Sequence, residues 1–185
     1  ANRVPGDAGI TLGVVAPDGR DGMVQHAEQF AAAGIPVLFD PGQGLPMFGG
    51  EELRDFIGKA AWIAVNDYEG QLLAERTGWS HREIAARVRA LIVTKGAEGS
   101  VIHADGREHL IPAARPEAMV DPTGCGDAYR AGLIFGLMNG LDWETTGRIA
   151  SLMGAIKIEH AGTQPHAFTM DEFSRRYRAA FGRSL

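Results

Sequence analysis

The first half of the sequence alternates short apolar runs with amphipathic stretches, and this alternation limits the fold more than any other feature. The apolar runs are rich in β-branched residues and end in turn-forming residues, as buried strands do. Between them, apolar residues recur at the three- and four-residue spacing of a helix face. Strands that alternate with helices predict βαβ units, a mostly parallel sheet and helices on its faces. The expected strands cover residues 10–16, 36–40, 61–65 and 91–94.

Helices are expected between these strands because each amphipathic stretch carries its own start or stop residue. Glycines close two of them, as is common at helix C-termini, and a serine caps a third. Residues 40–46 are too rich in glycine and proline to be regular. The expected helices are one from Asp21 to Gly34, one over residues 51–60, one through Leu72 that ends at Gly78, and one that Ser80 caps and that passes Ile84 and Val88 to Leu91.

The second half of the sequence changes pattern. Two strand-like runs, residues 100–104 and 108–112, flank Asp105-Gly106, a dipeptide that favours a tight hairpin turn. No repeat or low-complexity linker marks a boundary, so residues 1–185 are expected to form a single α/β domain. Three further helices are expected, over residues 126–139, 144–158 and 171–181, and Met170, Phe173 and Tyr177 should share a face of the last.

Composition excludes several classes of protein. A net charge of −5 argues against a nucleic-acid or membrane-surface binder, since both need a concentrated basic face. Cys125 is the single cysteine, which excludes an internal disulfide framework and a thiolate zinc cluster and favours a reducing compartment, the cytoplasm. No apolar run approaches the ~20 residues of a membrane-spanning helix. We also expect no signal peptide, since the first residues lack the basic-then-apolar layout.

Residues 121–127, which we call the glycine loop, join a glycine-rich turn to an apolar helix. The unpaired amides of a helix's first turn and the positive end of its dipole favour an anion, and glycines let that anion approach closely. Asp127 then has two interpretations. It is a helix cap, or it takes a proton from a hydroxyl group that attacks a bound phosphate. Cys125 is better explained as a small residue in a tight turn than as a nucleophile.

Other polar motifs follow predicted strands directly, at the end of the sheet where ligands of parallel α/β proteins bind. Asn66 and Glu69 are also typical of an ordinary helix start, and the segment after Thr94 could be only a loose turn. The sequence lacks a G-x-x-x-x-G-K-[ST] loop, which excludes a P-loop nucleotide hydrolase. The motifs are Asp40-Pro41, Asn66-x-x-Glu69 and Thr94-Lys95-Gly96.

Taken in order, these motifs resemble the ribokinase-like (PfkB-type) family of carbohydrate and nucleoside kinases. Residues 121–132 resemble the C-terminal signature of that family, with Pro122 and Cys125 in place of a Thr and an Ala, and the likeness covers nearly the whole chain. Asn66-x-x-Glu69, Thr94-x-Gly96-x-x-Gly99 and Gly162-Thr163-Gln164 follow the family's order. Within the family, the chain is most similar to bacterial adenosine kinases at residues 40–43, 77–80, 121–124, 129–132 and 162–164.

The resemblance implies a role for each motif. Asp127 would be the catalytic base, and the backbone amides of Gly124, Cys125 and Gly126 would form an anion hole for the γ-phosphoryl group of ATP. Asn66 and Glu69 would influence Mg²⁺ and phosphate through ordered water. The residues bordering ATP would be Thr94, Gly96, Gly99 and Ser151. The residues around a monovalent cation, K⁺ if the protein uses one, would be Asp121, Thr123, Gly162 and Gln164.

The expected activity is therefore ATP-dependent phosphoryl transfer to the 5′-hydroxyl of adenosine, on a ribokinase-like sheet. A PfkB-type sugar kinase that acts on ribose or fructose is one alternative, and a non-catalytic nucleotide-binding module is another. Members of the family carry N-terminal strands, a lid and a ribose-binding Asp, and nothing before Ile10 matches them. We therefore expect the chain to be the C-terminal nucleotide-binding portion, with little turnover on its own.

Overall fold

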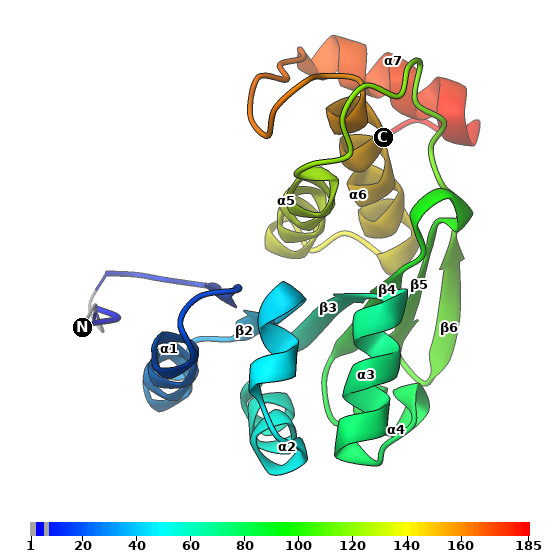
Figure 1. Ribbon diagram of the computed structural model, residues 1–185. Helices are drawn as coiled ribbons and strands as arrows, with labels where there is room; N and C mark the ends of the chain where they lie inside the picture. The colour runs from blue at the N-terminus through cyan, green and yellow to red at the C-terminus, as the bar shows by residue number, and fades with distance from the viewer. Residues whose placement is uncertain (1–2, 6–7) are drawn as a thin grey trace. The chain divides into compact units, whose positions relative to one another are not determined.

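The computed structural model describes residues 3–5 and 8–185 (Figure 1). Its strands form a six-stranded sheet in the order β1-β2-β3-β4-β5-β6. The chain divides into two compact units, each with elements of its own. Unit 1 comprises the described residues up to Thr94 together with His103–Glu108, and unit 2 comprises Lys95–Ile102 and His109–Leu185. No helix in the described part of the chain has the length and apolar character needed to cross a membrane.

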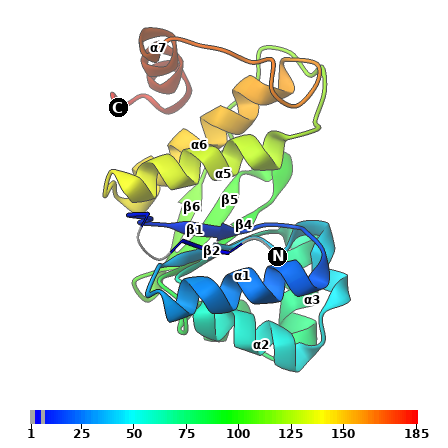
Figure 2. The ribbon, with the colours of Figure 1, turned by 90° about the vertical axis from the view of Figure 1, so that its left-hand side faces the viewer.

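Unit 1 contains the predicted alternation of strands and helices. The strands pair in parallel in sequence order, with Val14 opposite Leu38, Leu38 opposite Trp62 and Ile63 opposite Leu91. Right-handed crossovers in a constant direction place successive helices on one face, and α1, α2 and α3 lie on the same side of these strands (Figure 2). The elements are β1 (Gly13–Val15), α1 (Arg20–Ala32), β2 (Val37–Phe39), η1 (Gly42–Met47), α2 (Gly50–Lys59), β3 (Trp62–Asn66), α3 (Asp67–Thr77), α4 (His81–Ala85) and β4 (Ala90–Thr94).

The core of unit 1 forms between its parallel strands and the helices beside them. All of β2 and the first four residues of both β3 and β4 are buried, as their uniformly apolar sequences predict. Phe56 of α2 stacks on Phe39 of β2 with ring centroids 4.6 Å apart. Leu53 and Ile57, on the same face of α2, have no exposed surface. The apolar spacing in the sequence thus identified the buried face of this helix.

Two expectations for unit 1 were wrong. The segment expected to be irregular forms the 3₁₀ helix η1, whose turns close when the Gly44 amide donates to Pro41 O at 2.8 Å, and buried Leu45 anchors it to the core. Helix α4 ends at Ala85 and does not extend to Leu91. A turn follows the helix, and in it the Arg87 guanidinium lies 3.9 Å from the centroid of the Trp79 ring. Leu91 belongs to β4.

Unit 2 begins with the short helix η2 (Gly96–Glu98) and contains three long helices. The expected hairpin is confirmed and consists of β5 (Ser100–Ala104) and β6 (Arg107–Ile111). Residues 103–108 at its turn belong to unit 1. Both turn residues have positive φ, 53° at Asp105 and 74° at Gly106, as a two-residue type I′ turn requires. The helices are α5 (Cys125–Met138), α6 (Trp143–Ile158) and α7 (Met170–Phe181).

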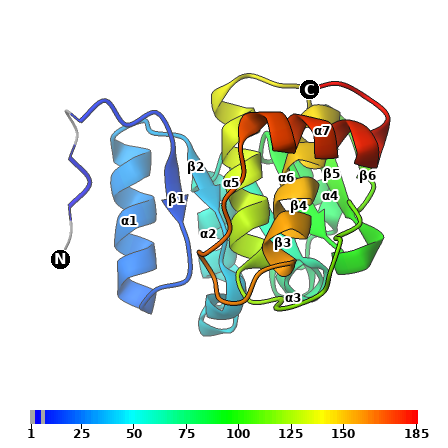
Figure 3. The same cartoon turned by 90° about the horizontal axis from the view of Figure 1, so that it is seen from above.

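Helices α5 and α6 run side by side, and α7 crosses them (Figure 3). The approach of α5 to α6 requires glycine, because a Cβ at Gly132 would lie 2.5 Å from Ala150 Cα. Helix α7 packs against α6 through Phe173 and Tyr177, which are buried. Met170, expected on the same face of α7, is 56% exposed at the start of the helix.

Candidate functional site

The glycine loop of unit 2 opens α5 without a side-chain cap. Gly124 occupies the N-cap position with φ of 83°, and a Cβ there would lie 3.4 Å from Thr163. The Cys125 amide closes the turn by donating to Pro122 O at 3.2 Å. Three amides were expected to bind an anion. The turn engages that of Cys125 and does not engage those of Gly124 and Gly126. An exposed glycine amide in the first turn of a 14-residue helix suits a phosphate oxygen.

Asp127 lies in the first turn of α5 and faces solvent, with 75% of its side chain exposed. Its Oδ1 accepts a hydrogen bond from Arg130 Nη2 at 2.6 Å. The guanidinium also lies over the loop, since a Cβ at Gly126 would be 3.1 Å from Arg130 Nη1. A guanidinium in this place suits a phosphate, which it can bind with two parallel hydrogen bonds. Arg130 was not among the expected site residues, although its i,i+3 spacing from Asp127 could have indicated the pair.

Asp121 joins the glycine loop to the loop that follows α6. One carboxylate oxygen accepts from the Thr123 amide at 2.9 Å and the other from the Gly162 amide at 2.8 Å. The Thr123 amide, the Thr123 hydroxyl and the Gly162 amide stabilise the ionised form and lower the pKa of Asp121 to about 2. Three of the four residues expected around a cation therefore lie together, and Gln164 is exposed on the same loop.

Lys157, in the last turn of α6, is a residue that the sequence analysis missed. Its side chain is fully buried, and its Nζ donates to Asp121 O at 2.8 Å and to His160 O at 3.0 Å. Ile158 O accepts from the amides of Val120 and Asp121, so the end of α6 carries the start of the glycine loop. The available signal was a lysine inside an apolar turn at a helix C-terminus, where a cation is favoured.

The Cys125 thiol contributes no evident reactivity to the loop. Burial raises its pKa, the charge of Lys157 acts in the opposite direction, and Asp121 adds to the rise. A thiol with a raised pKa carries less of the nucleophilic thiolate at neutral pH. This environment fits the expectation of a small residue packed in a turn.

Gly99 and Ser151, two residues expected near ATP, both contact the segment that follows β6. Gly99 has φ of 93°, and a Cβ there would lie 2.0 Å from Ile111 O. The Ser151 hydroxyl donates to Pro112 O at 3.0 Å and accepts from the Ala114 amide at 2.8 Å. Ser151 therefore holds the backbone of this segment. Gly96, with φ of 55°, lies in the turn before Gly99.

A buried hydrogen bond ties the segment after Gly99 to α5. Ser100 Oγ lies 2.6 Å from the Tyr129 hydroxyl, and burial raises the pKa of Tyr129 to about 12. The phenol is therefore neutral at physiological pH and acts as a structural link. Tyr129 is two residues from Asp127, so this bond fixes the first turn of α5 against the segment after Gly99.

In unit 1, Asn66, Glu69 and Thr94 lie at the carboxyl ends of β3 and β4, where Asn66 is paired in register with Thr94. Asn66 Oδ1 accepts from the Glu69 amide at 2.8 Å, and Glu69 Oε2 accepts from the Asn66 amide at 2.9 Å. This is a capping box for α3, the plainer of the two interpretations. The second carboxylate oxygen of Glu69 is outside this box and lies near the carboxyl end of β3 as a further acceptor.

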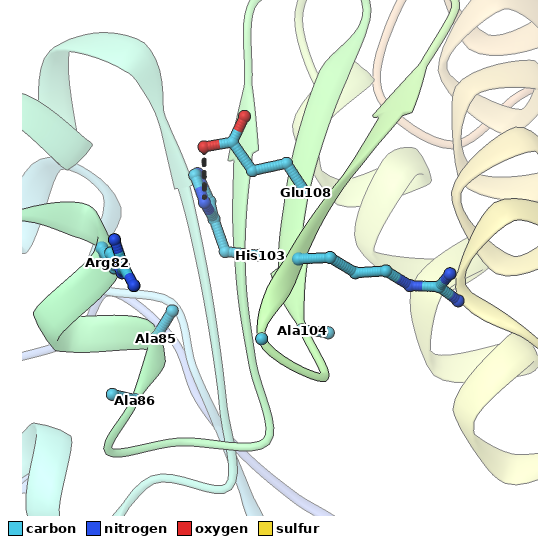
Figure 4. A pocket seen from close by; sticks show the side chains of 8 residues that line it. Arg82, Ala85, Ala86, His103, Ala104 and Glu108 are labelled. Carbon is cyan, nitrogen blue, oxygen red and sulfur yellow. Dashed lines mark ion pairs between the residues drawn. The ribbon is translucent and has the colours of Figure 1, made fainter.

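The described residues contain no cluster of three or more His, Cys, Asp or Glu side chains placed to hold a metal ion. Unit 1 has a hollow of about 520 Å³ beside the β5–β6 turn (Figure 4). His103 Nδ1 lies 3.4 Å from Glu108 Oε1 at its wall. None of its lining residues belongs to the motifs singled out in the sequence. They are Arg82, Ala85, Ala86, His103, Ala104, Gly106, Arg107 and Glu108.

A six-stranded α/β sheet with a glycine loop at the start of a helix is the architecture of the ribokinase-like fold. The chain belongs to the pfkB family of carbohydrate kinases, whose model, described as "pfkB family carbohydrate kinase", matches residues 10–169. The family and the fold expected from the sequence are thereby confirmed.

Nucleoside kinases are among the relatives and solved structures that the chain resembles. The structure of a Burkholderia thailandensis nucleoside kinase with inosine is 55% identical with a TM-score of 0.94, and the match covers 97% of this chain and 60% of that one. A second structure of the same kinase, in complex with ADP-inosine, is 54% identical with a TM-score of 0.94. That match covers 97% of this chain and 56% of the other. A Methanocaldococcus jannaschii nucleoside kinase is 35% identical over 140 residues, 76% of this chain and 46% of the relative. The chain thus spans about half the length of the curated relatives it matches.

Proposed function

We propose that the protein to which this chain belongs is an ATP-dependent nucleoside kinase that phosphorylates the 5′-hydroxyl of adenosine or a related purine nucleoside. The observation that carries the proposal is the start of α5, where Gly124 gives the helix no side-chain cap and Asp127 lies in the first turn. Phosphoryl transfer needs positioning and charge stabilisation more than covalent chemistry, so a helix terminus, amides and one carboxylate suffice. The nucleoside kinases among the similar structures support a nucleoside as acceptor.

In this proposal Asp127 accepts the proton of the 5′-hydroxyl as its oxygen attacks the γ-phosphorus. The Gly124 and Gly126 amides, and the Cys125 amide once its turn bond opens, hold the phosphoryl oxygens. Arg130 supports the step by leaving Asp127 for the incoming phosphate, because the Asp127 oxygen that accepts from Arg130 must be free to accept the substrate proton. Its transfer would place a positive charge where negative charge develops.

The cofactor residues fit ATP with Mg²⁺. Magnesium retains several waters, and its chemistry here would be to neutralise phosphate charge. Asn66 and Glu69 would contact its water shell from the carboxyl end of β3, and Thr94, Gly96, Gly99 and Ser151 would shape the nucleotide side. The cytoplasm is the proposed location, because a single cysteine is typical of a protein in a reducing compartment.

The test of the base is Asp127→Asn in the complete gene product. The amide keeps the shape of the side chain and cannot take the proton, so kcat should fall by about 10²–10⁴ while the Kd for ATP changes little. Steady-state kinetics and calorimetric ATP binding measure the two quantities.

Asp171→Asn, which changes an exposed carboxylate in the first turn of α7, is the matched control and should keep wild-type kcat. If Asp127→Asn turns over normally, Asp127 is not the base and is only a helix-terminal carboxylate. A complete protein that binds ATP and phosphorylates neither nucleosides nor sugars would favour the non-catalytic module.

A further inference from the structure

Lys157 places a buried positive charge where the sequence predicted a monovalent metal ion. Its side chain has no exposed surface, although it belongs to a residue type that is rarely buried. Burying an ammonium group is costly unless hydrogen-bond acceptors replace its water. Two carbonyls supply this replacement, Asp121 O at 2.8 Å and His160 O at 3.0 Å. The ammonium thus joins the glycine loop to the loop after α6.

Three oxygens of Asp121, the carboxylate expected beside K⁺, already accept hydrogen bonds from groups of the chain. Both carboxylate oxygens of Asp121 accept backbone amides, from Thr123 and Gly162, and its carbonyl accepts from Lys157. A metal ion bound by the same carbonyl would lie within a few ångströms of the ammonium and would be repelled by it. The surroundings of Asp121, with each of its oxygens bonded within the chain and an ammonium group on its carbonyl, therefore do not fit K⁺.

The charge of Lys157 also reaches the groups that a metal ion would influence. It helps to lower the pKa of Asp121 and opposes the rise in the pKa of Cys125. It lies in the last turn of α6, where the negative end of the helix dipole favours a cation. An ammonium and a potassium ion have the same charge and both bind carbonyl oxygens, so one can replace the other electrostatically.

We propose that the ammonium group of Lys157 is a built-in monovalent cation that holds the glycine loop in its anion-binding shape, so that the protein needs no K⁺. The inference depends on the proposed function only in assigning the loop to phosphate. Its structural part, a cation that binds the carbonyls of Asp121 and His160, stands apart from catalysis.

The first experiment uses the wild-type complete gene product in KCl and in choline chloride at equal ionic strength. The thermal unfolding midpoint, the calorimetric Kd for ATP and kcat should each agree in the two salts, the last two within about twofold. A tenfold or greater gain in ATP affinity on adding K⁺ would overturn the proposal. No substitution is needed, so this arm decides even if variants fail to fold.

The second experiment uses Lys157→Ala, which removes the charge and opens space for a small cation. In choline its unfolding midpoint should fall by about 5 °C or more, and K⁺ or NH₄⁺ at about 0.1 M should restore part of the loss. Lys59→Ala, at an i,i+4 ion pair with Asp55 on α2, is the control and should respond equally to the three salts.

The unfolding midpoint of Lys157→Ala could instead be equally low in K⁺, NH₄⁺ and choline. This result would show that Lys157 serves packing alone and would refute the inference. Failure of the proposed function has a different signature. A wild-type protein that transfers no phosphate in either salt while its variant shows cation rescue would refute the kinase and leave the role of Lys157 standing.

Discussion

Asp121 and Asp127 are two carboxylates of the same loop with different partners. Asp121 accepts two backbone amides, which cannot move away, and its pKa is about 2. Asp127 is held by the movable side chain of Arg130 and is largely exposed. A carboxylate fixed by backbone amides holds the structure, whereas one bonded to a movable side chain can be released to contact a substrate. At the scale of the residue, this difference supports the proposed role of Asp127 in the chemistry and ties Asp121 to the shape of the loop.

The lowered pKa of Asp121 predicts a pH dependence of stability. The folded pKa of about 2 lies below the ordinary 3.8, so ionisation adds stability above about pH 4, and this contribution disappears as the pH falls toward 2. The free energy of unfolding should therefore differ most between wild type and Asp121→Asn at neutral pH. Urea unfolding followed by circular dichroism over this pH range measures the difference.

Asp171→Asn is the control for that series, because it removes a carboxylate outside the loop. A wild-type advantage over Asp121→Asn that stays constant from pH 7 to pH 2 would contradict the prediction, since it would not depend on ionisation.

At the scale of the element, α5 and α6 meet through small residues, and this contact supports the loop that opens α5. A Cβ at Gly132 would lie 2.5 Å from Ala150 Cα, and one at Gly136 would lie 2.4 Å from Thr146 Oγ1. Backbone cannot move aside as a flexible side chain can, so the first of these contacts is the stricter. The position of the N-terminus of α5 therefore depends on glycines within the helix.

Gly132→Ala should destabilise the protein although alanine is the better helix former. The helix propensity gain is about 1 kcal/mol, and relieving the clash costs about 1–3 kcal/mol, so we expect a net loss of up to about 2 kcal/mol. Gly154→Ala in α6 is the matched control. Its Cβ would meet only Cys125 O at 3.6 Å, so stability should stay the same or rise by about 1 kcal/mol. Urea unfolding of both variants tests the prediction, which fails if they respond alike.

At the scale of the whole molecule, the chain belongs to the pfkB family, and its matches cover 46% of one curated relative and 60% of one solved structure. Within unit 2, Tyr129 connects α5 to Ser100, and hydrogen bonds to Asp121 connect the glycine loop to Lys157 and Gly162. Which molecule accepts the phosphoryl group must therefore be tested on the complete gene product.

The complete gene product should prefer purine nucleosides to free sugars. We expect kcat/KM for adenosine and inosine to exceed that for ribose and fructose by about 10²-fold or more, because a site built to hydrogen-bond a base loses those bonds with a sugar. A coupled assay of ADP release over these four acceptors measures the ratio. Preference for ribose or fructose would favour the sugar kinase.

The sequence by itself determined the parallel strands, the hairpin, the three long helices and the glycine loop. Each depends on local information, such as the spacing of apolar residues, the Asp105-Gly106 turn or a run of loop residues before a helix. The sequence analysis failed where tertiary packing overrides local pattern. Buried Leu45 orders a segment rich in glycine and proline, and a turn ends α4 before its apolar spacing ends.

Only the tertiary structure decided how the loop is held. Lys157 binds Asp121 across 36 residues, Gly162 binds Asp121 across 41, and Tyr129 meets Ser100 across 29. No local pattern specifies such pairs, because a buried lysine and an exposed one look alike in an amphipathic helix. Asp127 could therefore be proposed as a base from its neighbours in sequence, whereas the buried ammonium group of Lys157 beside its loop follows from the packing of the end of α6 against the glycine loop.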